Sequence, residues 1–249
     1  MISFAFSGRT ALITGAGSGI GRSIAIAFSQ AGARTVVAGR RLPELEETVR
    51  MIGTAGGEAV AIAADVANER SVSELIRDAG PLHLAVNAAG IVQGGSLDDM
   101  NAEAFERVFD VNVTGLWLAM KHEIRAMKAS GGGAIVNIGS NIGARIVRPG
   151  MGAYAASKAA VSSLTRTAAL EAVEHGIRIN CLCPGPTDTP LSMRPGEDRA
   201  ARDARVAATN PSKRVAATDE IAAATLWLAS DEAAYIVGQD IVIDGGASA

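Results

Sequence analysis

Tyr154 and Lys158 are the two residues whose types and spacing could do acid–base chemistry. They lie four positions apart in an alanine-rich run, residues 151–174, that predicts a helix on which both share one face. A neighbouring ammonium lowers a tyrosine pKa from its usual value of about 10. A shift of about 3 units takes about 4 kcal/mol. The pair therefore predicts a general acid/base; the alternative is a half-packed tyrosine beside a solvated lysine.

A glycine-rich segment near the N-terminus predicts a site for a dinucleotide. Residues 14–21 read Thr-Gly-Ala-Gly-Ser-Gly-Ile-Gly, after a predicted strand and before a predicted helix. There, backbone N–H groups and a helix N-terminus can face a pyrophosphate, and glycines allow its close approach. The alternative is a glycine turn with a purely structural role. The expected contacts are Gly15, Gly17, Ser18, Gly19, Ile20 and Gly21.

Short apolar strands alternate with helical segments along the whole chain. Strands are expected at residues 10–14, 35–38, 59–63, 82–86, 134–138, 177–181 and 240–243, and helices at 22–31, 43–53, 68–79, 101–128, 151–174 and 218–230. This alternation indicates an α/β fold: one Rossmann-like domain over residues 1–249, with a doubly wound parallel sheet of about seven strands flanked by helices. Ligands bind such sheets beyond the carboxyl ends of the strands. The proline-rich stretch 184–211 predicts a long loop with short helical pieces.

The composition argues against several classes of protein. The chain is 48% hydrophobic but only 4% aromatic, which suits a buried parallel sheet, and its net charge of -3 argues against nucleic-acid or membrane partners. It begins with no signal-peptide pattern and has no run long enough to span a bilayer, so we expect a cytoplasmic protein. Cys181 and Cys183, two apart on a predicted strand, are expected to be reduced core thiols. The three histidines have no metal-ligand spacing, so no metal is expected.

Five short motifs occur in order, each at a predicted strand end or on the helix that follows. They are Thr14 to Gly21, Asn87-Ala-Ala-Gly90, Ser140, Tyr154-x-x-x-Lys158 and Pro184-Gly185. Together they resemble the classical short-chain dehydrogenase/reductase family over nearly the whole chain. The resemblance implies an NAD(P)-dependent oxidoreductase that interconverts a ketone, such as a 3-oxoacyl compound, and a secondary alcohol by hydride transfer. It also implies a small-molecule carbonyl or alcohol substrate and a homotetramer.

The resemblance assigns catalytic roles to four residues. Tyr154 would donate or accept the proton, and Lys158 would lower its pKa and bind the nicotinamide ribose. Ser140 would hold the substrate oxygen, or else only cap a turn. Asn112 would anchor a water in a proton relay, or else be a buried amide satisfied by backbone.

The resemblance also implies further contacts to the cofactor. Asp65 would accept a hydrogen bond from the adenine amine, or instead cap the following helix. Asn87 and its neighbours would line the adenosine ribose, or else close a tight turn. Thr187 and Thr189 would contact the nicotinamide carboxamide or a phosphate. The full set is Asp65, Val66, Asn87, Ala88, Gly90, Pro184, Gly185, Thr187 and Thr189, together with Tyr154 and Lys158.

The end of the second predicted strand indicates which dinucleotide binds. An acidic residue there bonds the ribose hydroxyls of NAD. Here Gly39 holds that position and Arg40 and Arg41 follow. Because a guanidinium binds phosphate in a bidentate manner, we expect NADP(H). NAD(H) stays an alternative because Gly17 stands where some NADP-dependent relatives carry a basic residue, and both arginines could be solvated surface charges.

The substrate pocket is expected between residues 141–152, Gln93-Gly94 and a covering loop at residues 186–212. Arg145, Arg148 and Arg194 in these segments could bind an acidic or acyl-carrier substrate, or be rim charges. Two other functions stay open. One is a relative with lyase or dehalogenase chemistry and no redox step, and the other is a nucleotide-sensing protein without turnover.

Overall fold

Seven parallel strands form one sheet in the computed structural model, which describes residues 4–249. The spatial order is β3-β2-β1-β4-β5-β6-β7, so the chain reverses direction across the sheet between β1 and β4. The strands are β1 (Thr10–Thr14), β2 (Arg34–Gly39), β3 (Ala59–Ala63), β4 (Leu84–Asn87), β5 (Gly133–Ile138), β6 (Ile177–Pro184) and β7 (Asp240–Ile243). This topology confirms the predicted doubly wound sheet and puts the switch point, where such sheets bind ligands, between β1 and β4.

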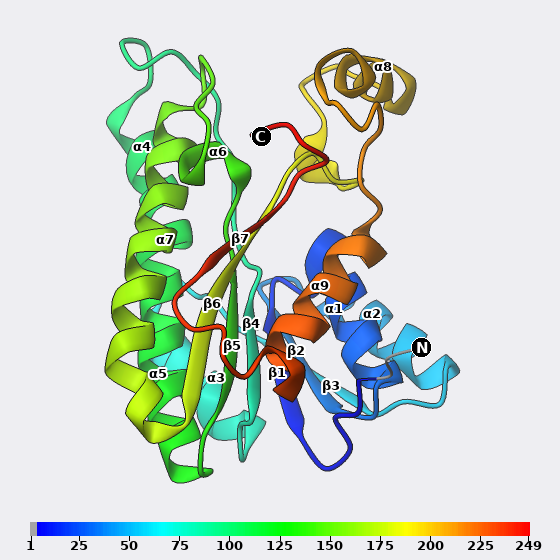
Figure 1. Cartoon of the computed structure of the whole chain (residues 1–249), viewed down its shortest axis with the longest axis vertical. Coiled ribbons are helices and arrows are strands. Elements are labelled where there is room, and N and C mark those ends of the chain that lie inside the picture. The colour runs from blue at the N-terminus through cyan, green and yellow to red at the C-terminus, as the bar shows by residue number, and fades with distance from the viewer. Residues whose placement is uncertain (1–3) are drawn as a thin grey trace.

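Helices cover both faces of the sheet (Figure 1). One face carries α1 (Gly19–Gln30), α2 (Leu42–Thr54) and α9 (Thr218–Ala229), and the other carries α3 (Glu69–Ala79), α5 (Gly115–Ala129) and α7 (Gly152–Ala172). Three further helices, α4 (Ala102–Phe109), α6 (Asn141–Ala144) and α8 (Arg199–Thr209), lie at the upper end of the molecule in Figure 1. This end is formed by the carboxyl ends of the strands.

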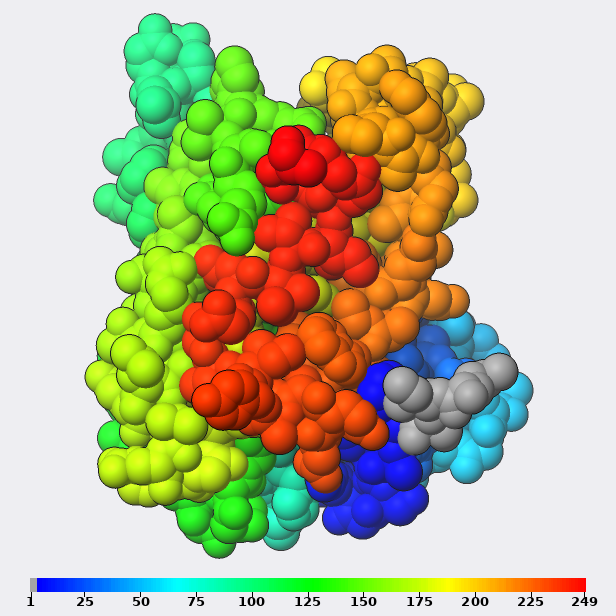
Figure 2. Space-filling model, viewed as in Figure 1, coloured from blue at the N-terminus to red at the C-terminus, as the bar shows by residue number. Residues whose placement is uncertain are grey.

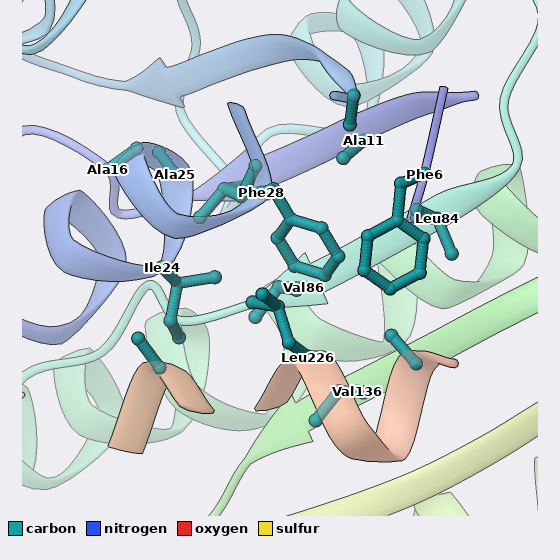
Figure 3. Packing of buried hydrophobic residues seen from close by; sticks show 14 of the residues in the cluster. Phe6, Ala11, Ala16, Ile24, Ala25, Phe28, Leu84, Val86, Val136 and Leu226 are labelled. Atoms are coloured by element: carbon teal, nitrogen blue, oxygen red, sulfur yellow. The ribbon is translucent and has the colours of Figure 1, made fainter. Parts of the chain in front are cut away.

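Two apolar layers, one on each face, hold the helices to the sheet. On the first face, the Phe6 and Phe28 ring centroids lie 5.1 Å apart, and Leu226 of α9 meets them over Val86 (Figure 3). Each fully buried side chain of this size contributes about 1.5–3 kcal/mol. On the second face, the small side chains of Ala169 and Ala172 allow α7 to lie close to the strands.

The observed elements differ from the sequence prediction mainly at their ends. The predicted helix 101–128 is α4 and α5 joined by a π-helical turn, Asp110–Thr114, and the side chain of Asn101 caps α4 by accepting from Ala104 N at 2.7 Å. Helix α1 begins at Gly19 rather than Arg22, so the last glycines of the turn are helical. The stretch 184–211 contains a 3₁₀ turn, Pro190–Ser192, as well as α8. In the described part of the chain, no helix is both long and apolar enough to cross a membrane.

Cys181 and Cys183 are buried free thiols on one side of β6, as predicted, with their sulfurs 3.6 Å apart. They pack against Gly139, where a Cβ would lie 2.6 Å from Cys181 Sγ and 2.9 Å from Cys183 Sγ. The pairing of β6 with β7 brings Asp240 beside them, so that the three side chains offer ligand atoms within 4.8 Å of one another. Sequence spacing did not reveal this cluster, and the Asp240 carboxylate is already ion-paired with Arg166 at 3.1 Å.

Candidate active site

A cavity of about 1350 Å³ runs along the carboxyl ends of the strands. The turns that follow β1 to β6 form its walls, and Figure 2 shows the molecular surface notched at this end, between residues near α4 and α6 and residues of α8. The sequence-predicted residues that line it are Gly15, Gly17, Ser18, Gly19, Ile20, Gly21, Arg40, Arg41, Asp65, Val66, Ala88, Gly90, Ser140, Tyr154, Lys158, Pro184, Gly185, Thr187 and Thr189. Asn87 and Asn112 do not line it.

The glycine turn fits tightly between β4 and α2. Gly15 has φ +69°, and a Cβ there would lie 2.8 Å from Ala89 N; a Cβ on Gly21 would lie 2.5 Å from Gly15 O. Side chains at these positions would therefore collide with backbone. Helix α1 begins at Gly19, and its first N–H groups, which have no intrahelical partner, lie at the cavity wall. This arrangement fits a bound pyrophosphate.

Arg22 fastens the glycine turn to α2, a role that the sequence analysis missed. Its guanidinium donates to Gly17 O, to Glu44 O at 3.3 Å and to Thr48 Oγ1 at 3.0 Å. Thr48 in turn donates to Ala16 O at 2.9 Å. In the sequence, the only indication of this role is that Arg22 directly follows the last glycine of the turn.

Asn87 does not line the ribose region of the cavity, where the resemblance had assigned it. Its side chain is 4% exposed, and Nδ2 donates to Glu123 Oε2 at 2.9 Å and to Asn137 Oδ1 at 3.0 Å. The last residue of β4 thus points into the core toward α5, while Ala88 and Gly90 of the following turn line the cavity. The Thr14 hydroxyl holds this turn to β1 by accepting from Ala89 N at 3.3 Å.

Glu123 is a fully buried carboxyl group that the sequence analysis did not single out. Burial raises the pKa of Glu123 to about 7, and the hydrogen bond from Asn87 acts in the opposite direction. The network continues through Asn137, whose Nδ2 donates to Thr165 Oγ1 at 2.8 Å. Among the described residues, Glu123 Oε1 and Asn87 Oδ1 have no hydrogen-bond partner. The carboxyl therefore lies just beneath the turn that carries Ala88.

Asn112 lies in the π-helical turn and is 1% exposed. Its Oδ1 accepts from Ile91 N at 2.9 Å, and its Nδ2 donates to Ile91 O and to Ser157 Oγ, each at 3.0 Å. The side-chain amide is thus satisfied by backbone and a serine hydroxyl, and its role in anchoring a water stays a prediction. Its observed role is to join the loop after β4 to helix α7.

Ser140 and Tyr154 meet at the cavity wall between β5 and α7. The Ser140 hydroxyl caps α6 by accepting from Ile142 N at 3.1 Å. The same hydroxyl therefore acts as a helix cap and lies in the predicted site. Burial raises the pKa of Tyr154, while hydrogen bonding to the Ser140 side chain acts to lower it. Tyr154 is 8% exposed, so its hydroxyl is almost withdrawn from solvent.

Lys158 lies one turn after Tyr154 on the same face of α7. Its Nζ donates to Ile138 O at 2.7 Å and is 5.8 Å from the centroid of the Tyr154 ring. Burial lowers the pKa of Lys158. The expectation that Lys158 depresses the Tyr154 pKa differs from the structure, where the pKa of Tyr154 is raised because desolvation of the phenolate dominates.

Arg40 and Arg41 differ in their surroundings. Arg41 is ion-paired with Glu44 at 2.9 Å, whereas the exposed Arg40 guanidinium has no side-chain partner among the described residues. Asp65 lines the cavity nearby, and its Oδ1 accepts from Ala67 N at 3.1 Å. The helix that follows, α3, is capped by Asn68, whose Oδ1 accepts from Ser71 N at 2.9 Å, rather than by Asp65. Together with the glycine turn, these residues fit a bound dinucleotide.

The segment 186–212 closes one side of the cavity. Thr189 faces the glycine turn, since a Cβ on Gly19 would lie 3.1 Å from its Cγ2. Ion pairs hold the segment together, among them Arg202 with Asp188 and Arg205 with Glu197, each at 2.7 Å.

The far end of the cavity contains part of the expected substrate pocket. Arg148 and Arg194 line it, whereas Arg145 and Gln93 do not. Apolar residues that the sequence analysis did not name line it too: Val92, Pro149, Leu191. Pro149 and Leu191 lie within segments that were expected to form the pocket, but which side chains of these loops line the cavity depends on the fold and not on a local pattern.

The fold and the cavity define an α/β protein of the dinucleotide-binding class. A family model described as enoyl-(acyl carrier protein) reductase matches residues 15–248. The cis-4-hydroxycyclohexanecarboxylate dehydrogenase of Sinomonas cyclohexanicum is 39% identical over 251 residues, 98% of this chain and 98% of that protein. The cyclohexanol dehydrogenase of an Acinetobacter species is 37% identical over 245 residues, 96% of this chain and 95% of that protein.

A solved structure agrees with these relatives. A protein described as an NAD(P)-dependent gluconate 5-dehydrogenase from Beutenbergia cavernae, with NADP bound at low occupancy, superposes with a TM-score of 0.92. The two chains are 34% identical, and the match covers 99% of each. The chain therefore belongs to the short-chain dehydrogenase/reductase family, and it is an oxidoreductase.

Proposed function

We propose that this chain is an NADP(H)-dependent oxidoreductase that interconverts a ketone and a secondary alcohol, with Tyr154 as general acid/base. The observation that carries the proposal is one cavity lined by the glycine turn, Arg40, Ser140 and Tyr154. The relatives named for cyclohexanol and for 4-hydroxycyclohexanecarboxylate support an alicyclic alcohol as the substrate.

Different residues of the cavity bind the cofactor, hold the substrate and transfer the proton. The glycine turn and the start of α1 would hold the pyrophosphate, and Lys158, which uses one N–H for Ile138 O, keeps two donors for ribose hydroxyls. The bound dinucleotide supplies or accepts a hydride. The Ser140 hydroxyl holds the substrate oxygen while Tyr154 gives it a proton as the phenol in reduction and takes one as the phenolate in oxidation. A raised Tyr154 pKa keeps that proton available at neutral pH.

The preference for NADP(H) rests on the end of β2. Gly39 offers no carboxylate to repel a 2′-phosphate. Arg40 is exposed and unpaired among the described residues, so it can turn to a phosphate without breaking an ion pair. Arg41 would first have to leave Glu44. The bound NADP in the Beutenbergia structure supports the same preference.

Binding of the two cofactors tests this proposal. NADPH and NADH fluorescence titrations of the wild type should give tighter binding of NADPH. Arg40→Ala should weaken NADPH binding about 10- to 100-fold, the loss of charge-assisted hydrogen bonds, and leave NADH binding nearly unchanged. Arg41→Ala should have a smaller effect. Reduction of cyclohexanone with NADPH then tests turnover, and binding without any turnover of ketones would favour a nucleotide-sensing protein.

We also propose that the chain forms a homotetramer through α4, α5 and α7. Large apolar side chains are exposed on these helices: Phe105 (39%), Trp117 (46%) and Leu170 (75%). Exposed apolar groups on three helices that pack against one another support an interface between subunits. Light scattering of the purified protein measures its mass, and a monomeric mass at micromolar concentration would contradict the proposal.

A further inference from the structure

Arg148 lines the cavity from a turn that leads directly into the helix carrying Tyr154. Met151 N donates to Arg148 O at 3.1 Å, and Gly95 N donates to Gly150 O at 3.0 Å. The turn is thus held both by its own hydrogen bond and by the loop after β4. Arg148 is therefore presented to the cavity from a fixed backbone and is only partly exposed.

The charges at this end of the cavity are all positive. Lys158 donates to Ile138 O, and Arg205 is paired with Glu197, whose carboxylate also accepts from the Arg194 backbone N–H. The guanidinium groups of Arg148 and Arg194, in contrast, form no hydrogen bond or ion pair with any residue between 4 and 249, and Arg148 is the less exposed of the two.

No acidic side chain balances this charge from the cavity wall. The two acidic residues among the described lining residues are Glu44 and Asp65, which follow β2 and β3 at the glycine-turn end. Glu44 is already paired with Arg41. The substrate end therefore carries a cation whose counter-charge is missing from the protein.

The rest of this end is apolar. Val92, Ile142, Met151, Leu191 and Met193 line it together with Arg148. An apolar chamber suits the hydrocarbon body of a substrate. The partly buried Arg148 guanidinium at its edge favours a planar anion, which it binds through two parallel hydrogen bonds.

We propose that Arg148 makes this enzyme selective for hydroxy and oxo acids, in which an apolar ring or chain carries a carboxylate away from the reacting carbon. The inference rests on the proposed ketone–alcohol function. In oxidation, the substrate carbon loses a hydride to NADP⁺, and its hydroxyl loses a proton by way of Tyr154. The C–O bond becomes C=O, while the carboxylate takes no part in the reaction and serves only to bind.

A comparison of an acid with its neutral ester tests the proposal. The substrates are cis-4-hydroxycyclohexanecarboxylate and its methyl ester, and the measured quantity is the ratio of their kcat/KM values with NADP⁺. We expect the wild type to prefer the acid at least about tenfold. Arg148→Gln should lower the ratio about 10- to 100-fold, mainly through a higher KM for the acid, because a charge-assisted contact is lost. Arg148→Lys should recover part of the preference.

Arg145→Gln is the matched control, because Arg145 is exposed three residues earlier and does not line the cavity. It should leave the ratio unchanged. Competition by cyclohexanecarboxylate, which lacks the hydroxyl, gives a second readout: its inhibition constant should rise in Arg148→Gln, while that of cyclohexanecarboxamide should not. An unchanged ratio in Arg148→Gln, or a wild type that prefers the ester, would overturn the inference and leave the proposed function standing. No turnover of any alcohol or ketone would overturn the proposed function itself.

Discussion

The Lys158 ammonium lies 5.8 Å from the centre of the Tyr154 ring, and its hydrogen bond goes to Ile138 O at 2.7 Å rather than to the phenol. The two residues share a helix face, yet the lysine is directed at the end of β5. Burial raises the pKa of Tyr154, and the Lys158 ammonium makes no hydrogen bond that would oppose this effect.

Replacement of Tyr154 by Phe should remove proton transfer while keeping the cavity shape. We expect kcat for ketone reduction to fall about 10²- to 10⁴-fold, the usual contribution of a general acid, with the NADPH dissociation constant changed less than about twofold. Steady-state kinetics and fluorescence titration measure the two quantities. The chain has one other tyrosine, Tyr235, which is fully exposed, so Tyr235→Phe is the control. Turnover within tenfold of the wild type would remove the role given to Tyr154.

The raised pKa of Tyr154 can be measured directly. In Tyr235→Phe, Tyr154 is the sole tyrosine. The tyrosinate absorbance of this variant should increase only above the ordinary pKa of about 10. Because reduction uses the protonated phenol, its rate should not fall between about pH 6 and 9 through this group. An increase in tyrosinate absorbance near pH 7 in the protein without cofactor would contradict the conclusion that burial raises the pKa of Tyr154.

Gly39→Asp should change the cofactor preference from NADPH to NADH. A Cβ at Gly39 would lie 3.5 Å from Leu45 Cδ2, which is ordinary contact, so the side chain can be accommodated. A carboxylate there repels a 2′-phosphate and can bond the ribose hydroxyls of NADH. We expect NADPH to bind at least about 30-fold more weakly and NADH to bind more tightly. Gly39→Ala, which adds the Cβ without charge, should leave the ratio of the two dissociation constants nearly unchanged.

Glu123 should make the stability of the protein depend on pH. Its pKa is about 7 in the folded protein against 4.5 ordinarily, so the folded state binds this proton more tightly than the unfolded state. The favourable contribution is complete below about pH 4.5 and is lost as pH rises to about 7, a loss of about 3 kcal/mol.

Glu123→Gln tests this dependence because glutamine does not titrate. Relative to the wild type, the variant should gain about 3 kcal/mol more in the free energy of unfolding at pH 8 than at pH 4.5. Urea unfolding followed by tryptophan fluorescence gives both values. Glu106→Gln, at an exposed position of α4, is the control and should show no such difference. If Glu123→Gln changed the free energy of unfolding by the same amount at both pH values, the buried carboxyl would not titrate in this range.

The sequence predicted the sheet and the edge at which the cavity lies. Strand–helix alternation, the glycine turn after β1 and the cap at Asn68 are local signals, and each acts over a few residues. These signals were enough to predict that Ser140 and Tyr154 lie in one cavity, since parallel strands end at the same edge of the sheet.

The directions of three buried polar groups could not be predicted from local sequence. Asn87 turns into the core because it meets Glu123, 36 residues later in the chain. Glu123 itself follows Lys121 and His122, a polar context that favours an exposed position. Asn112 is oriented by a π-helical turn that no composition signal marks. Burial raises the pKa of Tyr154 in the protein without cofactor, and burial is a property of the fold that the spacing of Tyr154 and Lys158 does not reveal.

The contact between Gly139 and the two thiols of β6 has an evolutionary consequence. Because a Cβ at residue 139 would collide with both sulfurs, the three positions are epistatic: a larger residue at 139 is tolerated only where the strand residues are small. In an alignment of relatives, alanine or serine at position 139 should therefore covary with alanine or glycine at positions 181 and 183. The residues packed beneath Ser140 would then change in pairs during evolution rather than one at a time.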